Sequence, residues 1–149
     1  MEGPKKTYPI AIKIASILYI VLFVYTATSK LLDFNQFKIQ LGQSPIITAY
    51  ADPVAWGIPL LELVLAGLLL FPKTMLLAFY SGFSLMTMFT TYIVLILNFS
   101  DYIPCSCGGV LEDLGWTEHI VFNLVFVVMA VIAIYFLERK QILNKIEQP

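Results

Sequence analysis

The sequence predicts an all-α membrane protein, a bundle of four transmembrane helices with a short amphipathic external helix after the first span. Hydrophobic residues make up 59% of the 149 residues and charged residues only 13%, whereas soluble domains are about 45–50% apolar and about 25% charged. The chain also contains four apolar runs, each near the about 20 residues that a helix needs to cross a bilayer. Little sequence lies outside these runs. We therefore expect residues 1–149 to form a single integral membrane domain.

The four predicted spans cover residues 10–32, 54–71, 75–97 and 120–137. The first apolar run exceeds the about 7–15 apolar residues of a signal peptide, so we expect a retained span. Pro72 lies in a tight turn that makes the second and third spans a helical hairpin. Thr117 is expected to be the N-cap of the fourth span, with Trp116 at the membrane interface.

The connection after the first span carries a helical pattern. Asp33 with Gln36 resembles a capping box, and Phe34, Phe37 and Leu41 recur at helical spacing. This pattern predicts a short amphipathic helix lying on the membrane surface, where it would contact lipid. A packed loop with scattered apolar anchors explains the same residues equally well.

The distribution of Lys and Arg predicts the orientation of the chain. Seven of the nine lie in the N-terminal leader and first turn of the first span, the turn after the second span, and the C-terminal tail, while Lys30 and Lys38 lie on the opposite side. The positive-inside rule then places both termini in the cytoplasm. The connection of residues 98–117 faces the exterior, which is the periplasm for a bacterial inner membrane. The net charge of −1 gives no reason to expect nucleic acid as a partner.

Both cysteines of the protein, Cys105 and Cys107, lie in this exterior connection, in a Pro- and Gly-rich setting. Disulfides form and persist outside the cytosol. A Cys-x-Cys disulfide closes a very small ring, so we expect it to be strained, and strained disulfides are the labile ones that exchange. The pattern predicts a redox-active pair. Inert thiols and metal ligands are the alternatives.

A metal site would use Cys105, Cys107 and His119, with Glu112 or Asp113. Thiolates and imidazole suit zinc or copper. The spacing matches no standard zinc pattern, in which cysteine pairs are usually Cys-x₂₋₄-Cys. We therefore assign no metal ligands.

His119 and Asn123 are four residues apart and share one face at the start of the fourth span. His119 is a candidate catalytic residue, because an imidazole there could deprotonate an attacking thiol or relay its proton. The alternative is a structural histidine that caps its own helix, with Asn123 bonded across the bundle.

Lys30 and Glu62 are ionisable residues in the outer halves of the first and second spans. A charge inside a membrane is costly and usually has a partner. One interpretation is an ion pair that pins two helices together. The other is a cofactor-binding role, in which Glu62 carries protons or polarises a quinone-like ligand.

With these residues in place, the chain resembles the MauE/DoxX family of redox-associated membrane proteins, which includes the methylamine utilisation protein MauE. Three segments carry the resemblance: Ser29-Lys30-Leu31-Leu32-Asp33, Pro59-Leu60-Leu61-Glu62-Leu63, and Pro104-Cys105-Ser106-Cys107-Gly108-Gly109. It implies a four-helix bundle similar in theme to DsbB and vitamin K epoxide reductase, with a thioredoxin-like periplasmic partner and, from the DoxX side, a membrane quinone. Cys105 and Cys107 would be the exchanging pair.

These observations predict a membrane thiol–disulfide redox protein, either an oxidoreductase or an accessory to one. The chain has a single cysteine pair, so it needs a quinone or a partner dithiol as its second redox station. The alternative is a non-enzymatic membrane adaptor or maturation factor, or a metal-handling protein, in which the Cys-x-Cys connection is structural.

Overall fold

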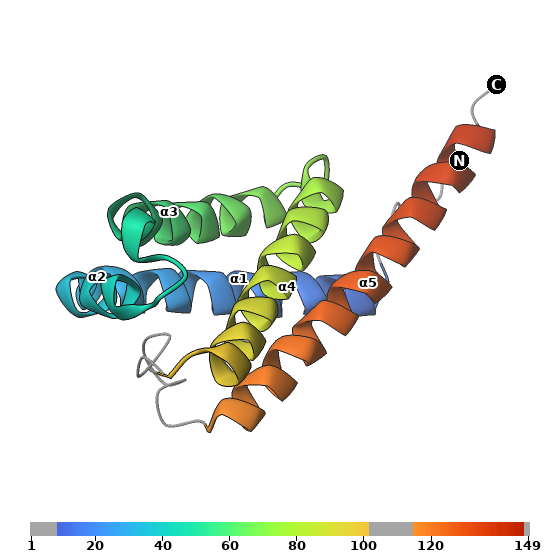
Figure 1. Cartoon of the computed structure of the whole chain (residues 1–149). Coiled ribbons are helices and arrows are strands. Elements are labelled where there is room, and N and C mark those ends of the chain that lie inside the picture. The colour runs from blue at the N-terminus through green and yellow to red at the C-terminus, as the bar shows by residue number, and fades with distance from the viewer. Residues whose placement is uncertain (1–8, 102–114, 148–149) are drawn as a thin grey trace.

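The computed structural model describes residues 9–101 and 115–147, and within these ranges the chain is helical and has no strand (Figure 1). The elements are α1 (Ile10–Leu32), α2 (Phe34–Gln43), the 3₁₀ turn η1 (Thr48–Tyr50), α3 (Ala51–Leu69), α4 (Met75–Phe99) and α5 (Trp116–Glu147). Four of the described helical segments are long and apolar enough to cross a membrane, namely α1, η1 with α3, α4 and α5. The predicted fold class is confirmed.

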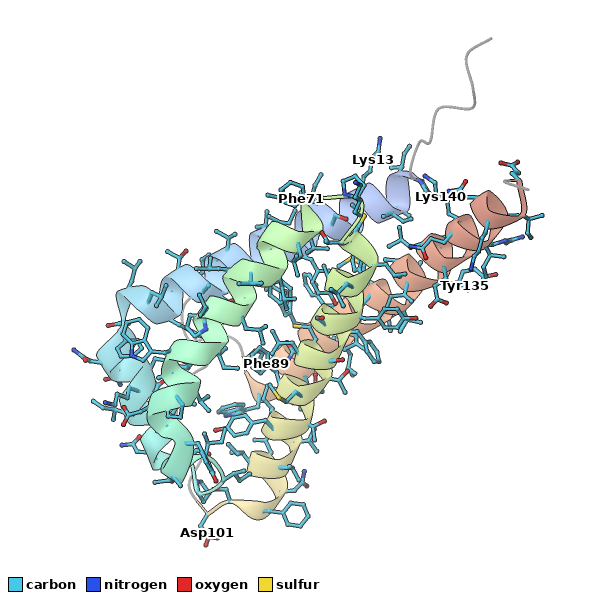
Figure 2. All side chains as sticks on the ribbon, turned by 90° about the horizontal axis from the view of Figure 1, so that it is seen from above. Lys13, Phe71, Phe89, Asp101, Tyr135 and Lys140 are labelled. Atoms are coloured by element: carbon cyan, nitrogen blue, oxygen red, sulfur yellow. The ribbon has the colours of Figure 1, made fainter. Side chains whose placement is uncertain are left out.

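The four long helices form two closely packed pairs that are joined into a bundle. α1 packs mainly against α3, and α4 packs mainly against α5, while α3 also contacts α4 and α1 also contacts α5. α3 runs alongside α1, and α4 and α5 are inclined across them (Figure 1). Lys13, Phe71 and Lys140 lie at one end of the bundle and Asp101 lies at the other (Figure 2).

The bundle is held together by an aromatic cluster around Tyr19 of α1. Its ring meets Phe79 of α4 and Phe126 of α5 edge to face, with centroid distances of 5.7 and 5.1 Å. The Tyr19 hydroxyl donates a hydrogen bond of 2.6 Å to the Phe126 carbonyl oxygen. A Cβ on Gly82 of α4 would lie 3.3 Å from the Tyr19 ring, so this glycine makes room for the ring against α4.

The outward faces of the long helices remain apolar. Ile17 of α1, Leu60 of α3 and Val125 of α5 are 60%, 64% and 59% exposed. In water such surfaces would be a liability. In a bilayer they face the hydrocarbon, and the helices satisfy their own backbone hydrogen bonds.

The helix after the first span is present as α2, so the packed-loop alternative is wrong. α2 lies against α3 through the Phe34 and Trp56 rings, whose centroids are 4.5 Å apart, and through an ion pair between Lys38 and Asp52. The predicted capping box is wrong, because no side chain caps α2. Asp33 has φ −112° and ψ 41°, whereas an N-cap side chain normally bonds from an extended backbone.

The start of α5 also differs from the sequence prediction. Thr117 lies inside the first turn, and Gly115 precedes the helix, with its carbonyl accepting the first backbone hydrogen bond from His119 at 3.0 Å. The Glu118 carboxyl group folds back over Gly115 and occupies the place that a Cβ would need. Glycine is an accepted N-cap residue, and here its missing side chain makes the room. α5 then continues to Glu147, beyond the predicted span.

Candidate functional site

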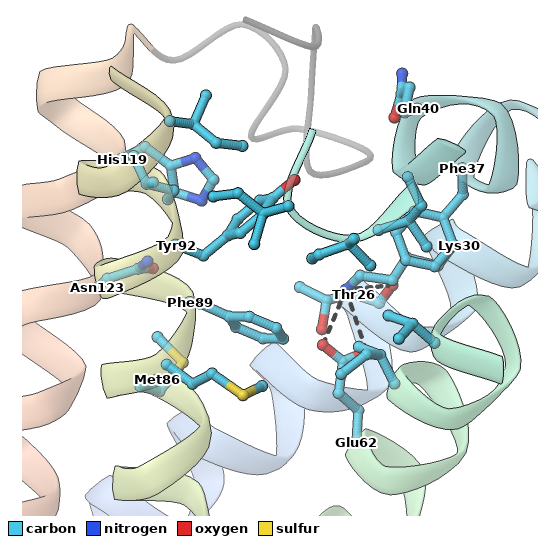
Figure 3. A pocket seen from close by; sticks show the side chains of 18 of the residues that line it. Thr26, Lys30, Phe37, Gln40, Glu62, Met86, Phe89, Tyr92, His119 and Asn123 are labelled. Carbon is cyan, nitrogen blue, oxygen red and sulfur yellow. Dashed lines mark hydrogen bonds and ion pairs between the residues drawn. The ribbon is translucent and has the colours of Figure 1, made fainter. Parts of the chain in front are cut away.

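A cavity of about 380 Å³ lies between the helices and receives side chains from every α-helix and from the connection between α2 and α3 (Figure 3). Its walls are mostly apolar, with aromatic and aliphatic residues that include Leu22, Phe37, Ile58, Phe89, Tyr92 and Phe122. Ligand sites typically occupy about 300–1,000 Å³ and combine apolar walls with a few placed polar groups. The cavity meets both conditions.

The polar side chains buried within the described ranges gather at this cavity. Seven polar or charged residues are buried in the described ranges. Five of these seven line the cavity: Thr26, Lys30, Glu62, His119 and Asn123. Polar groups inside a membrane are costly and tend to mark functional sites. Their concentration around one apolar cavity makes it the candidate site.

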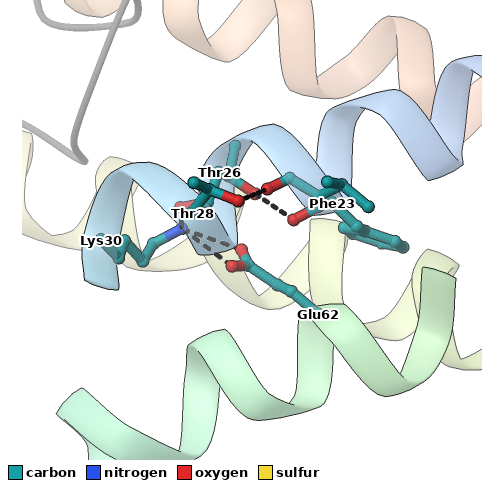
Figure 4. Close-up of polar contacts among 6 residues, drawn as sticks. Phe23, Thr26, Thr28, Lys30 and Glu62 are labelled. Carbon is teal, nitrogen blue, oxygen red and sulfur yellow. Dashed lines mark hydrogen bonds and ion pairs between the residues drawn. The ribbon is translucent and has the colours of Figure 1, made fainter. Parts of the chain in front are cut away.

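Lys30 and Glu62 form a buried ion pair between α1 and α3 (Figure 4). The Lys30 Nζ lies 2.9 Å from Oε1 and 3.2 Å from Oε2 of Glu62, and 3.5 Å from the Thr26 carbonyl oxygen. The two side chains are only 7% and 1% exposed. The ion pair expected from the sequence is therefore present, and it joins the last turn of α1 to the middle of α3.

Two aromatic rings cover the Lys30 ammonium group. The Phe37 ring of α2 and the Phe89 ring of α4 each have their centroid 5.9 Å from Nζ. A cation at this distance from a ring face is attracted by the ring quadrupole. Lys30 therefore brings α2 and α4 together with α1 and α3 at one wall of the cavity.

His119 and Asn123 lie on the other side of the cavity, on the first turns of α5 (Figure 3). They are 6% and 3% exposed. The Asn123 Nδ2 is buried and has no hydrogen-bond partner among the described residues. Within the described ranges the Asn123 Nδ2 therefore makes no hydrogen bond across the bundle.

Cys105 and Cys107 lie outside the described residues, as do Glu112 and Asp113, so their roles stay predictions. The helices on either side of this connection reach the cavity, since Ile96 in the last turn of α4 and Trp116 at the start of α5 both line it. Among the residues that the structure describes, no group of three or more His, Cys, Asp or Glu could hold a metal ion.

Sequence reasoning missed the part of the cavity that α4 contributes. Met86, Phe89 and Tyr92 line it, and their only signal was an apolar-aromatic face at a spacing of three residues. Trp116 was expected as an interface anchor and also lines the cavity. Thr26 had one signal, because it precedes Lys30 by four residues and so shares its helix face.

Comparison with known proteins identifies a family. The family model described as methylamine utilisation protein MauE matches residues 8–136. No curated protein and no solved structure matches the chain. Because the family match covers most of the 149 residues, the chain belongs to the MauE family, and it is a multi-pass membrane protein.

Proposed function

We propose that this MauE-family membrane protein is a thiol–disulfide redox protein. In this proposal Cys105 and Cys107 exchange a disulfide with a thioredoxin-like partner outside the membrane, and a membrane quinone serves as the second redox station. One observation carries the proposal. The connection that holds both cysteines joins two helices, α4 and α5, whose neighbouring turns line an apolar cavity with a buried polar set.

Chain connectivity limits how far Cys105 can lie from the end of α4. Cys105 follows Asp101 by four residues, and an extended chain spans at most about 3.6 Å per residue, which allows about 14 Å. Cys107 precedes Gly115 by eight residues, and α5 begins one residue later with Trp116. This connectivity supports a pathway between the cysteine pair and the cavity.

The exchange step follows ordinary thiol chemistry. A thiolate of the partner attacks one sulfur of the Cys105–Cys107 disulfide, and the other cysteine leaves as a thiolate, which gives a mixed disulfide. The second thiol of the partner then displaces the remaining cysteine. The partner leaves oxidised, and the Cys105–Cys107 pair has gained two electrons and two protons.

His119 is the candidate to handle one of these protons. It is the only histidine of the chain, it lies in the first turn of α5, and it lines the cavity. An imidazole can accept a proton from a thiol and release it again near neutral pH. We propose that it does so for the thiol that is nearer to the cavity.

The cavity residues fit a quinone. The walls are apolar, as a lipid-soluble ring and tail require, and the Asn123 Nδ2 has no acceptor among the residues that the structure describes. A bound quinone would supply an acceptor for two electrons and two protons. The residues of this chain would hold its ring and keep water away from it.

Thiol trapping in cells tests the exchange. Cells that express C105S or C107S are quenched with acid and alkylated, and any mixed disulfide is identified by mass spectrometry. We expect one of the two variants to accumulate a mixed disulfide with a protein that carries a thioredoxin-like Cys-x-x-Cys motif, and C105S/C107S to accumulate none.

The same double variant separates the alternatives. A non-enzymatic adaptor predicts that C105S/C107S keeps partner binding and full function, which would refute the redox proposal. A metal-handling protein predicts stoichiometric zinc or copper on the purified wild type, lost in the double variant.

A further inference from the structure

We propose that Asn123 is the hydrogen-bond donor that anchors a lipophilic carbonyl compound in the cavity. The ligand class rests on the proposed function, in which the compound is a quinone. The binding itself requires only the cavity and Asn123, neither of which depends on the cysteines.

The buried ion pair is a poor anchor because its hydrogen bonds are already made. The Lys30 ammonium has three donors, and it has three acceptors within reach, at 2.9 and 3.2 Å on Glu62 and 3.5 Å on the Thr26 carbonyl. Both Glu62 oxygens accept from it. Phe37 and Phe89 then cover the ammonium group. The pair therefore shapes and polarises one wall of the cavity, while its own polar atoms are satisfied.

Asn123 is in the opposite situation. Its side chain is 3% exposed, lines the cavity, and has an Nδ2 without a hydrogen-bond partner in the described ranges. Figure 3 shows the amide directed toward the cavity from α5. Buried side-chain donors are nearly always paired. The missing partner of this donor is an acceptor atom inside the cavity.

The surroundings of Asn123 restrict the chemistry of that acceptor. The neighbouring walls are formed by Met86, Phe89 and Phe122, which provide flat and polarisable surfaces for a ring. A charged ligand would lose its hydration there. A buried water needs two to four polar partners, and a water between Asn123 and His119, which is one turn away on the same helix face, would have the minimum of two. A neutral lipophilic molecule with a carbonyl oxygen satisfies Asn123 and the apolar walls together.

Tryptophan fluorescence gives a direct binding assay. Trp116 lines the cavity, whereas Trp56 is 63% exposed and stacks on Phe34. A W56F/C105S/C107S background leaves Trp116 as the only reporter and removes the thiols. Duroquinone, a fully substituted quinone, is titrated into this protein in lipid nanodiscs. Durene has the same ring and methyl groups without carbonyls, and it is tested as a competitor.

The variant N123L removes the donor while keeping the volume. The matched control is N98L, because Asn98 is an exposed amide on α4 that already donates to the Val94 carbonyl at 2.7 Å. In the background protein we expect duroquinone to quench the Trp116 fluorescence in a saturable way. The apparent Kd for duroquinone should be at least fivefold weaker in N123L and unchanged in N98L. The apparent affinity of durene, measured by its competition with duroquinone, should be at least fivefold weaker than that of duroquinone, because durene cannot accept the hydrogen bond.

Three outcomes would overturn the proposal: quenching that does not saturate, equal duroquinone affinity in N123L and N98L, or durene competing as well as duroquinone. The durene comparison uses the native Asn123, so it stands even if N123L fails to fold. The binding assay uses a protein without cysteines, so it is independent of the thiol-trapping experiment. If trapping fails but duroquinone binds, only the disulfide exchange is refuted. If trapping succeeds but duroquinone does not bind, only this site is refuted.

Discussion

At the scale of single residues, the buried ion pair of Lys30 and Glu62 has a large effect on stability. The Lys30 and Glu62 side chains are 7% and 1% exposed. Desolvation opposes burying either charge, and their attraction offsets it only while both are present. The pair thus holds α1 to α3, but it makes each residue hard to replace alone.

We predict that E62L and K30M each destabilise the protein strongly and that K30M/E62L recovers most of the loss. Removing one partner of a buried pair costs about 3–5 kcal/mol, whereas replacing both by apolar residues is often neutral. Thermal melting of the four proteins in one detergent measures the effect. Additive losses in the double variant would contradict this account of the pair.

The same double variant decides between the two roles considered for Lys30 and Glu62. If K30M/E62L folds and still exchanges disulfides, the pair is a structural pin. If it folds and loses exchange, the charges take part in the reaction.

At the scale of the helices, the spans were predictable but their faces were not. α1 covers the predicted residues 10–32, and α4 extends the predicted 75–97 by two residues to Phe99. Long apolar runs determine such bounds. Lipid-facing and core-facing residues are both apolar, however, so the pattern within a span does not show which side faces the bundle.

The candidate site was also predictable only in part. Lys30 and Glu62 were expected to meet because an unpaired charge in a membrane is costly, and they do. Phe89 and Tyr92 could not be assigned to a cavity, because an aromatic residue suits both lipid and core. The cap predictions at Asp33 and Thr117 were wrong for a local reason. Backbone geometry at Asp33 and the missing side chain of Gly115 decided those helix starts.

Gly82 provides a test of helix packing. A Cβ there would lie 3.3 Å from Tyr19 and 3.5 Å from Phe23, whereas a Cβ on Gly57 of α3 meets nothing within 4 Å. We expect G82L to destabilise the protein by about 1–3 kcal/mol, as overpacking typically does. G57L is the matched control and should change the melting temperature little. Equal effects of both substitutions would argue against the packing of the Tyr19 and Phe23 rings on Gly82.

At the scale of the whole molecule, the positive charges have a clear arrangement. Lys13 and Lys140 lie at the same end of the bundle as Phe71, and Asp101 lies at the other (Figure 2). From the positive-inside rule we propose that the lysine end faces the cytoplasm. In this orientation the cysteine connection, which begins beyond Asp101, starts from the exterior end.

Labelling of intact spheroplasts with a membrane-impermeant maleimide tests this orientation. After mild reduction, we expect Cys105 and Cys107 to be labelled from outside. A cysteine placed at the exposed Lys73 turn, in a C105S/C107S background, should react only after lysis. Labelling of K73C in intact spheroplasts, with protection of the native cysteines, would reverse the assigned orientation.

We propose that the cysteine pair and the cavity form one redox pathway through the molecule. If so, a change at Asn123 should alter the redox state of Cys105 and Cys107, although the two sites are on different segments. No structural role of Asn123 in α5 predicts that effect without a loss of fold.

The most direct measurement is the oxidised fraction of the Cys105–Cys107 pair in cells, read from the gel shift after acid quenching and alkylation with a large maleimide. We predict a mostly oxidised pair in wild type and N98L, and an accumulated reduced pair in N123L and in quinone-depleted cells, at equal protein levels. A pair whose oxidised fraction is the same in all four would contradict the account.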